Sequence, residues 1–367
     1  MGSARRFCAV AVLVVLTACT AVGDADDPPR RDDDRGRVAR SDAALAATIL
    51  DGEPGCSGAV GVEGDVVWTG SVGLADLASG ALLSADTVFE IGQVSNQFTA
   101  TLVLSLVQAG DVRLDDPVAA YLDGLPGWAA DITVDDLVHH TSGLPDYVDL
   151  LRERGFRPED VTTQADALKA VAAANELQFE PGFKFEYSAS NYLLLAEIVR
   201  AVTGSPLPAV MERMIFEPLD LDMTMDPAAE IADKAVSYTA TLGGGHDAVD
   251  WAWQQVGDGG INTTPAELVR WADNYRTGRL GGSRLQYAQL AGAAHTSLSD
   301  SGRAFAERYG AGIFIGRDGG LFHRGAWEGF VTALKITPDR RVAAAVACNV
   351  DNRVPSATAT ILALIWS

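Results

Sequence analysis

Lysine is scarce in this 367-residue sequence, and acidic side chains outnumber basic ones, 49 against 28. The four lysines are Lys169, Lys184, Lys234 and Lys335, so arginine carries most of the positive charge. The formal net charge is −21 and the isoelectric point is about 4.5. Because nucleic-acid binding relies on Lys and Arg to neutralise phosphates, we expect no nucleic-acid partner. The acidity itself is an ordinary aid to solubility.

Motifs for metal and nucleotide binding are also missing. The sequence has four cysteines and five histidines but no His-Glu-x-x-His and no Cys-x-x-Cys, which are common zinc signatures. His139 and His140 are adjacent, and adjacent side chains on one element do not face one ligand. The glycines at residues 243–245 lack the Lys-Ser/Thr that follows in a phosphate-binding loop. We therefore expect neither a metal ion nor a cofactor.

The N-terminal apolar run is too short to cross a bilayer, which takes roughly 20 apolar residues. It extends from Phe7 to Ala18, after two arginines, and ends at Cys19. A basic segment followed by a short apolar segment is typical of a secretory signal. Residues 16–19, Leu-Thr-Ala-Cys, resemble the lipobox of bacterial lipoproteins, in which the cysteine is lipidated. An ordinary secretory signal with a chance cysteine is the alternative interpretation.

These features predict a lipoprotein signal peptide at residues 1–18 and lipidation of Cys19. The mature protein is then exported and anchored on the outer side of the cytoplasmic membrane without spanning it. Residues 19–40 carry six Asp, five Arg and two Pro, which predicts a disordered tether. The remaining cysteines of the folded part are Cys56 and Cys348, and they either form a disulfide or stay as buried free thiols.

Hydrophobic patterning predicts the main elements of a folded chain that is 48% hydrophobic. Residues 57–74 contain two β-branched runs about a Glu-Gly-Asp turn, typical of a hairpin. Helical spacing predicts one helix ended by Gly110 and another closed by Gly204. Residues 329–337 and 341–350 are strand-like, and residues 357–366 are helical. Strands at both ends with helices between them predict one sheet built from both termini and a helical insertion.

Several motifs follow one another along the chain. They are residues 89–100 (FEIGQVSNQFTA), 114–118 (LDDPV), 137–145 (LVHHTSGLP), 181–189 (PGFKFEYSA), 257–260 (GDGG), 323–325 (HRG) and 329–330 (GF). This ordered set resembles the serine β-lactamase-related family, which includes class C β-lactamases, D-Ala-D-Ala carboxypeptidases and esterase relatives. The resemblance implies an α/β fold of the β-lactamase/transpeptidase type, an antiparallel sheet flanked by helices plus a mostly helical domain. Within residues 41–367, the α/β part would comprise 41–90 and about 300–367, and the helical part about 91–299.

The family's chemistry needs a Ser that opens a helix and a Lys three residues later to accept its proton. It also uses a Tyr-x-Asn and a Lys-Thr-Gly or His-x-Gly strand, and backbone N–H groups of the nucleophile and of that strand hold the oxyanion. By the resemblance, Gln93 stands at the Ser position and Asn96 at the Lys position. Ala189 replaces the Asn of the Tyr-x-Asn. Tyr187 and the His-x-Gly at residues 323–325, with its His323 and Gly325, are retained.

These departures predict a pseudoenzyme that acts by binding a small-molecule or peptide-like ligand, or a protein partner. A Gln amide is not a nucleophile and an Asn amide is not a base at neutral pH, and no lysine in the sequence follows a Ser by three residues. One alternative is a hydrolase or transferase in which Tyr187 and His323 activate water. Another is a structural or interaction protein at the cell surface.

The candidate binding residues are Gln93, Tyr187, His323 and Trp327. Trp251 and Trp253 are further candidate walls of the cleft, because aromatic faces give contact area at little entropic cost. We expect at least one of these tryptophans to lie in the core. The sequence leaves the ligand and the oligomeric state open.

Overall fold

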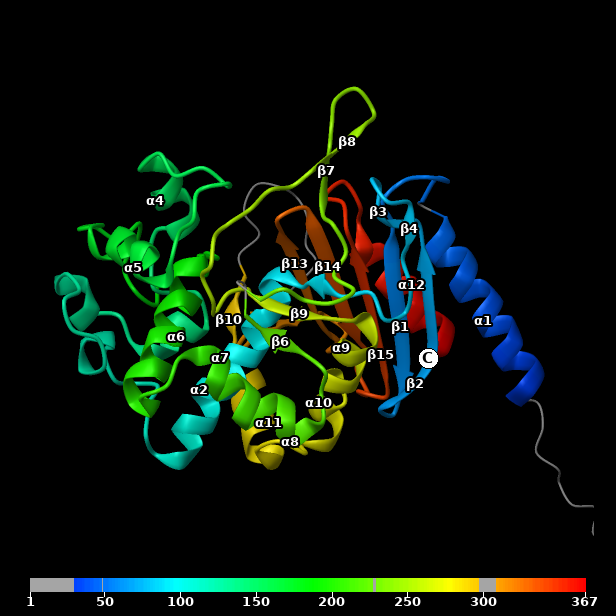
Figure 1. Ribbon diagram of the computed structural model, residues 1–367. Coiled ribbons are helices and arrows are strands. Elements are labelled where there is room, and N and C mark those ends of the chain that lie inside the picture. The colour runs from blue at the N-terminus through cyan, green and yellow to red at the C-terminus, as the bar shows by residue number, and fades with distance from the viewer. Residues whose placement is uncertain (1–29, 48, 227–228, 297–307) are drawn as a thin grey trace, which may run out of the picture.

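The computed structural model describes residues 30–47, 49–226, 229–296 and 308–367 (Figure 1). The predicted signal peptide, residues 1–18, and the predicted lipidation site Cys19 lie outside these residues. In the described part, residues from both ends of the chain build one large sheet, with helices on either side. The prediction of an antiparallel sheet flanked by helices, with a mostly helical part beside it, is confirmed.

Neighbouring strands of the large sheet are antiparallel. Their order is β10 (Ala294–His295), β11 (Arg308–Tyr309), β12 (Phe314–Ile315), β13 (Leu321–Trp327), β14 (Phe330–Ile336), β15 (Val342–Cys348), β1 (Cys56–Val62) and β2 (Asp65–Val72). Smaller pairings join β3 (Leu74–Asp76) to β4 (Ala81–Leu82), β5 (Phe89–Glu90) and β6 (Thr224–Met225) to β9 (Ile261–Thr263), and β7 (Tyr238–Ala240) to β8 (His246–Ala248).

The helices lie mostly between β5 and β10. They are α1 (Arg30–Ala46), α2 (Asn96–Ala109), α3 (Val134–Val138), α4 (Tyr147–Glu153), α5 (Gln164–Ala172), α6 (Ala189–Thr203), α7 (Leu207–Met211), α8 (Glu217–Leu219), α9 (Pro265–Ala272), α10 (Asn274–Thr277), α11 (Gly282–Leu290) and α12 (Pro355–Trp366). Short 3₁₀ segments are η1 (Gly92–Ser95), η2 (Val118–Ala120) and η3 (Gly127–Ala130), and η4 (Glu212–Phe216) is a π turn.

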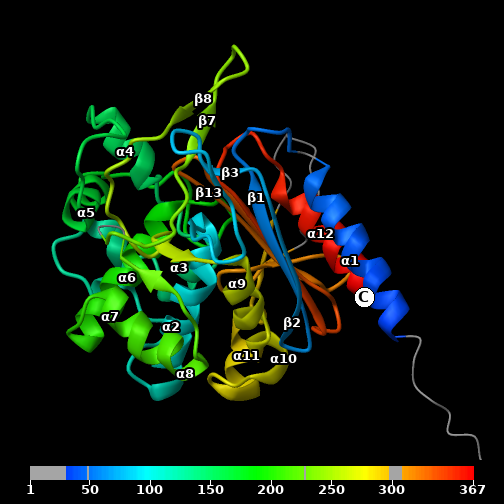
Figure 2. The ribbon, with the colours of Figure 1, turned by 45° about the vertical axis from the view of Figure 1, so that its right-hand side comes forward.

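The central strands are buried on both faces, so their side chains divide between two cores. Along β15, Ala344 and Val346 join the cluster under α1 and α12, while Ala343 and Ala345 join the larger cluster on the other face. This follows from the two-residue period of a strand. Figure 2 shows α1 and α12 side by side against the sheet. Helix α9 packs on β1 and β15, although it falls in the segment predicted to belong to the helical part.

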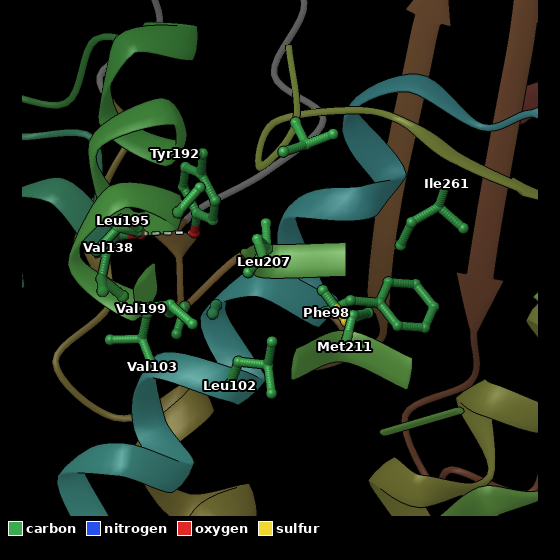
Figure 3. Close-up of a cluster of buried hydrophobic side chains, with 14 of the residues drawn as sticks. Phe98, Leu102, Val103, Val138, Tyr192, Leu195, Val199, Leu207, Met211 and Ile261 are labelled. Carbon is green, nitrogen blue, oxygen red and sulfur yellow. Dashed lines mark hydrogen bonds between the residues drawn. The ribbon is translucent and has the colours of Figure 1, made fainter. Parts of the chain in front are cut away.

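The helical part packs around α2, α6 and α7, and its buried side chains are continuous with the larger cluster on that face of the sheet. Both predicted helices are confirmed, and α2 and α6 end at Gly110 and Gly204 in the left-handed conformation that glycine adopts easily. The Tyr192 hydroxyl donates a hydrogen bond to the carbonyl of Val138, which ties α6 to α3 (Figure 3). The side chains that meet here include Phe98, Leu102, Val103, Leu195, Val199, Leu207, Met211 and Ile261.

The prediction of a disordered tether over residues 19–40 is wrong from Arg30 onward, where α1 begins. Within the helix, Asp33 pairs with Arg37 one turn later. The Arg37 guanidinium lies 5.7 Å from the ring centroid of Trp366, and the indole N–H of Trp366 donates to Ser41 Oγ at 3.0 Å. These contacts come from the other end of the chain, so the charge-rich composition of the segment alone does not reveal them.

Within the described residues, no single helix is long and apolar enough to cross a membrane. Helix α6 and the segment Leu207–Leu219 meet the length and composition criteria only as a pair bent by 72°.

Cys56 and Cys348 form a disulfide between β1 and β15, where they are direct partners in the antiparallel register. This decides between the two possibilities that the sequence leaves open. The bond joins residues 292 positions apart and ties the first strand of the folded part to the last. It therefore constrains almost the whole chain in the unfolded state.

We predict that replacing both cysteines, Cys56→Ala with Cys348→Ala, lowers the free energy of unfolding by about 2–4 kcal/mol, the usual effect of losing a native disulfide. Urea denaturation of the oxidised protein and of the variant measures the difference. Reduced wild-type protein is the control and is expected to fall close to the variant. Equal stability of all three samples would contradict the prediction.

Candidate functional site

The segment that opens α2 lies directly against β13. A Cβ atom on Gly325 would lie 2.0 Å from the carbonyl oxygen of Ile91 and 3.0 Å from the amide nitrogen of Gln93. Gly92 has a φ of +54°, and a Cβ there would lie 2.9 Å from the amide nitrogen of Ala326. Both positions require glycine because two backbones meet without room for a side chain. This contact places residue 93 beside the strand.

Gln93 forms a two-point amide pair with the backbone of Ala326. The Ala326 N–H donates to Gln93 Oε1 at 2.8 Å, and Gln93 Nε2 donates to the Ala326 carbonyl at 3.3 Å. In the described part of the chain, β12 pairs with β13 only at Leu321 and Phe322. The Gln93 side chain thus supplies hydrogen-bond partners to a stretch of β13 that β12 does not reach. These polar groups lie at the surface of a cleft.

Asn96 is fully buried one turn into this segment and holds two phenols together. Its Nδ2 donates to the hydroxyls of Tyr187 at 3.2 Å and Tyr309 at 3.3 Å. Its Oδ1 has no hydrogen-bond partner among the described residues. Burial, reinforced by the negative charge of Asp258, raises the pKa of Tyr187 well above its ordinary value. Tyr187 therefore stays protonated at neutral pH.

Ala189 is the first residue of α6, and its side chain lines the cleft. Its backbone N–H donates to Asp146 Oδ2 at 2.9 Å, so the carboxylate of Asp146 caps the start of the helix, where amide groups lack partners within the helix. A methyl group at this position offers the cleft no hydrogen bond.

His323 is buried and lies outside the cleft lining. Its Nδ1 lies 2.8 Å from the Arg324 carbonyl, and its Nε2 lies 3.5 Å from the Tyr309 hydroxyl. It borders a different groove, between β13 and α12. Burial lowers the pKa of His323 to about 4, with the charge of Arg324 acting in the same direction. The imidazole is therefore neutral at pH 7, and hydrogen bonds link it to Tyr187 indirectly, through Tyr309 and Asn96.

The cleft between the sheet and the helical part has a volume of about 400 Å³. It brings together five of the predicted residues or positions, Gln93, Tyr187, Ala189, Trp251 and Trp327. The ring centroid of Trp251 lies 5.1 Å from that of Trp327 and 5.0 Å from that of Trp253. Trp253 is the buried member of the three, and its indole N–H donates to the Arg157 carbonyl. One tryptophan is thus a core residue, as expected, and the other two line the cleft.

A second cavity of about 230 Å³ adjoins the cleft at Trp251 and Trp327, and three carboxyl groups line it, those of Glu90, Asp258 and Glu328. Burial raises the pKa of Glu90 to about 7, although N–H donors from Gly260 and Gly92 oppose the shift. Burial raises the pKa of Asp258 to about 8, and the charge of nearby Asp146 adds to the shift. Burial also raises the pKa of Glu328 to about 8, with the charge of Glu90 as the second cause.

Sequence reasoning misses several residues of this region. Ala326 and Glu328 adjoin recognised motifs, but only the folded strand shows what their backbone and side chain contact. Tyr309 belongs to no motif, so its place beside Asn96 has no sequence signal. Glu90 and Asp258 lie within recognised motifs, but the sequence does not show that their carboxyl groups are buried. No group of three or more His, Cys, Asp or Glu in the described ranges is arranged to hold a metal ion.

Comparison with known proteins gives consistent matches. The family model described as Beta-lactamase matches residues 43–364. A D-aminopeptidase of Brucella anthropi is 30% identical over 283 residues, 76% of this chain and 52% of the relative, so the chain spans about half the length of that enzyme. Penicillin-binding protein 4 of Amycolatopsis lactamdurans is 30% identical over 322 residues, 81% of each chain.

A solved structure agrees with the sequence matches. The octameric penicillin-binding protein homologue from Pyrococcus abyssi has a TM-score of 0.76 and 22% identity, covering 91% of this chain and 76% of that one. At this identity the likeness shows the fold.

We predict that the free energy of unfolding falls as the pH rises from 6.5 to 8.5. Glu90, Asp258 and Glu328 have raised pKa values in the folded state, so the folded state binds more protons than the unfolded state in this window. Each carboxyl contributes a slope of at most about 1.4 kcal/mol per pH unit. Starting at pH 6.5 limits the contribution of histidines, whose ordinary pKa is about 6.5.

Urea denaturation across this range tests the effect. Glu328→Gln is expected to flatten the curve because it removes one titrating group. Glu63→Gln changes an exposed carboxyl at the β1–β2 turn and should leave the slope as in wild type. Parallel curves for wild type and Glu328→Gln would show that the assignment is wrong.

Proposed function

The chain belongs to the beta-lactamase family, and we propose that it is an exported, lipid-anchored member that binds its ligand without acyl-enzyme chemistry. Its fold is of the β-lactamase/transpeptidase type, an antiparallel sheet flanked by helices with a mostly helical part. The cleft between these parts is the proposed binding site. Its ligand in this proposal is a small molecule or a peptide-like compound.

The amide pair between Gln93 and Ala326 is the observation that carries this proposal. By resemblance, an acyl-transfer site of this family holds the oxyanion with one N–H of the nucleophile and one N–H of the neighbouring strand. Ala326 supplies the strand N–H that faces residue 93, and Gln93 Oε1 accepts it at 2.8 Å. A substrate carbonyl would have to displace this oxygen. In this proposal, the residue at the nucleophile position therefore occupies the site where charge would develop.

The surroundings of Asn96 support the same conclusion. A general base must accept a proton, whereas the Asn96 amide donates through Nδ2 to Tyr187 and Tyr309. Tyr187 remains a neutral phenol because its pKa is raised. The arrangement fixes two hydroxyl groups by hydrogen bonds, and none of its three side chains, Asn96, Tyr187 and Tyr309, is a base at neutral pH.

The cleft retains the properties of a binding site. Its volume and its aromatic wall of Trp251 and Trp327 suit a compact ligand. The relatives are named a D-aminopeptidase and a penicillin-binding protein, which favours a peptide-like ligand with D-amino acids. The alternative of water activation by Tyr187 and His323 has less support, because His323 lies outside the cleft lining. No observation favours a purely structural role.

Export and lipidation form the second half of the proposal. The pattern of residues 5–19, two arginines, a short apolar run and Cys19 in a lipobox-like context, supports it. Helix α1 packs with α12 on the sheet face opposite α2 and α9. An anchor that precedes α1 would leave the cleft, which lies on the other side of the sheet, accessible to ligand.

We predict that a fluorescent penicillin and a fluorophosphonate do not label the purified wild-type protein, because the nucleophile is absent. Gel fluorescence after denaturation measures covalent labelling. The triple variant Gln93→Ser, Asn96→Lys, Ala189→Asn rebuilds the family motif and is expected to acquire weak labelling. Gln93→Ala, which has no nucleophile, is the matched control and should stay unlabelled. Stoichiometric labelling of wild type, mapped to the cleft, would refute the pseudoenzyme proposal.

We further predict that Cys19→Ser abolishes lipid incorporation and moves the protein from the membrane fraction to the soluble extracellular or periplasmic fraction. Metabolic labelling with a radioactive fatty acid, followed by fractionation, measures both effects. Cys8→Ser, within the predicted signal, is the control and should remain lipidated. Unchanged lipid incorporation in Cys19→Ser would remove the basis for the anchor.

A further inference from the structure

The second cavity adjoins the cleft, with which it shares Trp251, Asp258, Trp327 and Glu328, and it has the features of a ligand site of its own. Its volume is about 230 Å³, and neither Gln93 nor Tyr187 lines it. The residues that line it come from β5, the start of α4, the loop before β7, the segment that leads into β9, β9 itself, and the end of β13 with the turn that follows it. They include carboxylates, indole rings and an amide, a combination that ordinary core packing does not require.

Two buried side chains in this cavity carry oxygen atoms without a partner. Glu90 and Asn262 are 4% and 2% exposed, and they are direct partners in the β5–β9 register. Partners in register have Cβ atoms only about 5 Å apart, so both side chains can reach one ligand atom. Glu90 Oε2 and Asn262 Oδ1 have no hydrogen-bond partner among the described residues. A buried acceptor without a partner is costly, and a ligand donor would relieve that cost.

Indole rings cover the rest of the wall. Trp251 lies between Trp253 and Trp327, with ring centroids at 5.0 and 5.1 Å. The Trp251 Nε1 atom is buried and lacks a partner in the described part of the chain. Faces of tryptophan attract cations through the quadrupole of the ring. Buried oxygens and indole faces together favour a ligand that is both positively charged and organic.

The charges of the cavity point the same way. Glu90, Asp258 and Glu328 contribute three carboxyl groups, and Lys234 is the one cation that lines this cavity in the described chain. Each of the three carboxyls has a raised pKa, and the charge of Glu90 contributes to the shifts of Asp258 and Glu328. Neighbouring Asp146 adds to the repulsion at Asp258, and the Tyr147 hydroxyl donates to Asp258. Fully ionised, the cavity carries an excess of negative charge.

We propose that this cavity binds a small organic ammonium ion, with the ammonium group donating to Glu90 Oε2 and Asn262 Oδ1 and the tryptophans covering its carbon atoms. A metal ion is the less suitable occupant, since the described residues contain no cluster of three metal-ligating side chains. The site is independent of whether Gln93 has replaced a nucleophile, because Gln93 does not line it.

Titration with n-butylammonium chloride at pH 8.5, followed by tryptophan fluorescence and calorimetry, tests this assignment. n-Butanol is the neutral probe of similar shape, and sodium chloride controls for ionic strength. We expect saturable binding of butylammonium at least tenfold tighter than that of butanol. Its affinity should fall at least severalfold at pH 6, because the carboxyls that balance the ammonium charge become protonated there while the amine stays charged.

Glu90→Gln is the decisive variant, since its Oε1 still accepts from Gly260 and Gly92 while the negative charge is removed. It should weaken butylammonium binding at least tenfold. Trp251→Leu removes an aromatic face of the cavity and should also weaken butylammonium binding. This variant tests the proposal if Glu90→Gln folds poorly. Glu63→Gln, with the same change of charge at an exposed turn, and Gln93→Ala should bind as wild type does.

Four results would overturn the assignment. The first is an equal response to butanol and butylammonium, and the second is unchanged affinity for butylammonium in both cavity variants. The third is saturable binding of Mg²⁺ or Ca²⁺ without binding of butylammonium. The fourth is loss of butylammonium binding in Gln93→Ala, which would show that the probe occupies the cleft instead. The Gln93→Ala variant distinguishes binding in the cavity from binding in the cleft. If the cavity does not bind butylammonium, the penicillin-labelling experiment still tests the proposed function independently.

Discussion

The direct contact between the backbones of η1 and β13 is the constraint on which the site depends. Gly92 and Gly325 leave no space for a Cβ at the point where the two segments meet. This contact holds the first turn before α2 at the edge of the sheet, while the rest of α2 passes into the core of the helical part. One side of the cleft is therefore fixed by the sheet, and the start of the central helix is fixed with it.

Because of that contact, the side chain of residue 93 determines whether the backbone N–H and C=O of Ala326 at the edge of β13 are hydrogen-bonded. The Gln93 amide presents an acceptor and a donor at the spacing of a backbone amide, so it satisfies the N–H and C=O of Ala326 together. Each such hydrogen bond at a surface contributes on the order of 1 kcal/mol or less. The pair is thus weak enough for a ligand to displace. In the proposed function, it occupies the N–H group that an acyl-transfer reaction would need.

The sequence predicts the regular part of this fold well, because periodicity and glycine stops are local signals. The hairpin of β1 and β2, helices α2 and α6, strands β14 and β15, and α12 all lie where the patterns indicate. Helix α1 escapes prediction because its stability comes from Trp366 at the far end of the chain. Motif order identifies Gln93, Asn96 and Tyr187, but it says nothing of Ala326, whose role is a backbone N–H. His323 is an instructive case, since its motif predicts a binding residue and the strand directs it into the core.

The cavity lined by Trp251 and Trp327 shows why some site residues cannot be predicted from the sequence. Glu90 and Asn262 are far apart in sequence, and their pairing in the β5–β9 register brings two unsatisfied oxygens to one wall. Buried carboxyls with raised pKa values destabilise the folded state near neutral pH, because their ionisation is hindered there. Gln93 thus satisfies the backbone N–H and C=O of Ala326, whereas Glu90 Oε2 and Asn262 Oδ1 have no hydrogen-bond partner among the described residues. The proposed ammonium ligand would donate to both of these oxygens and relieve the cost of leaving them buried without a partner, which is the physical reason to propose a binding role here.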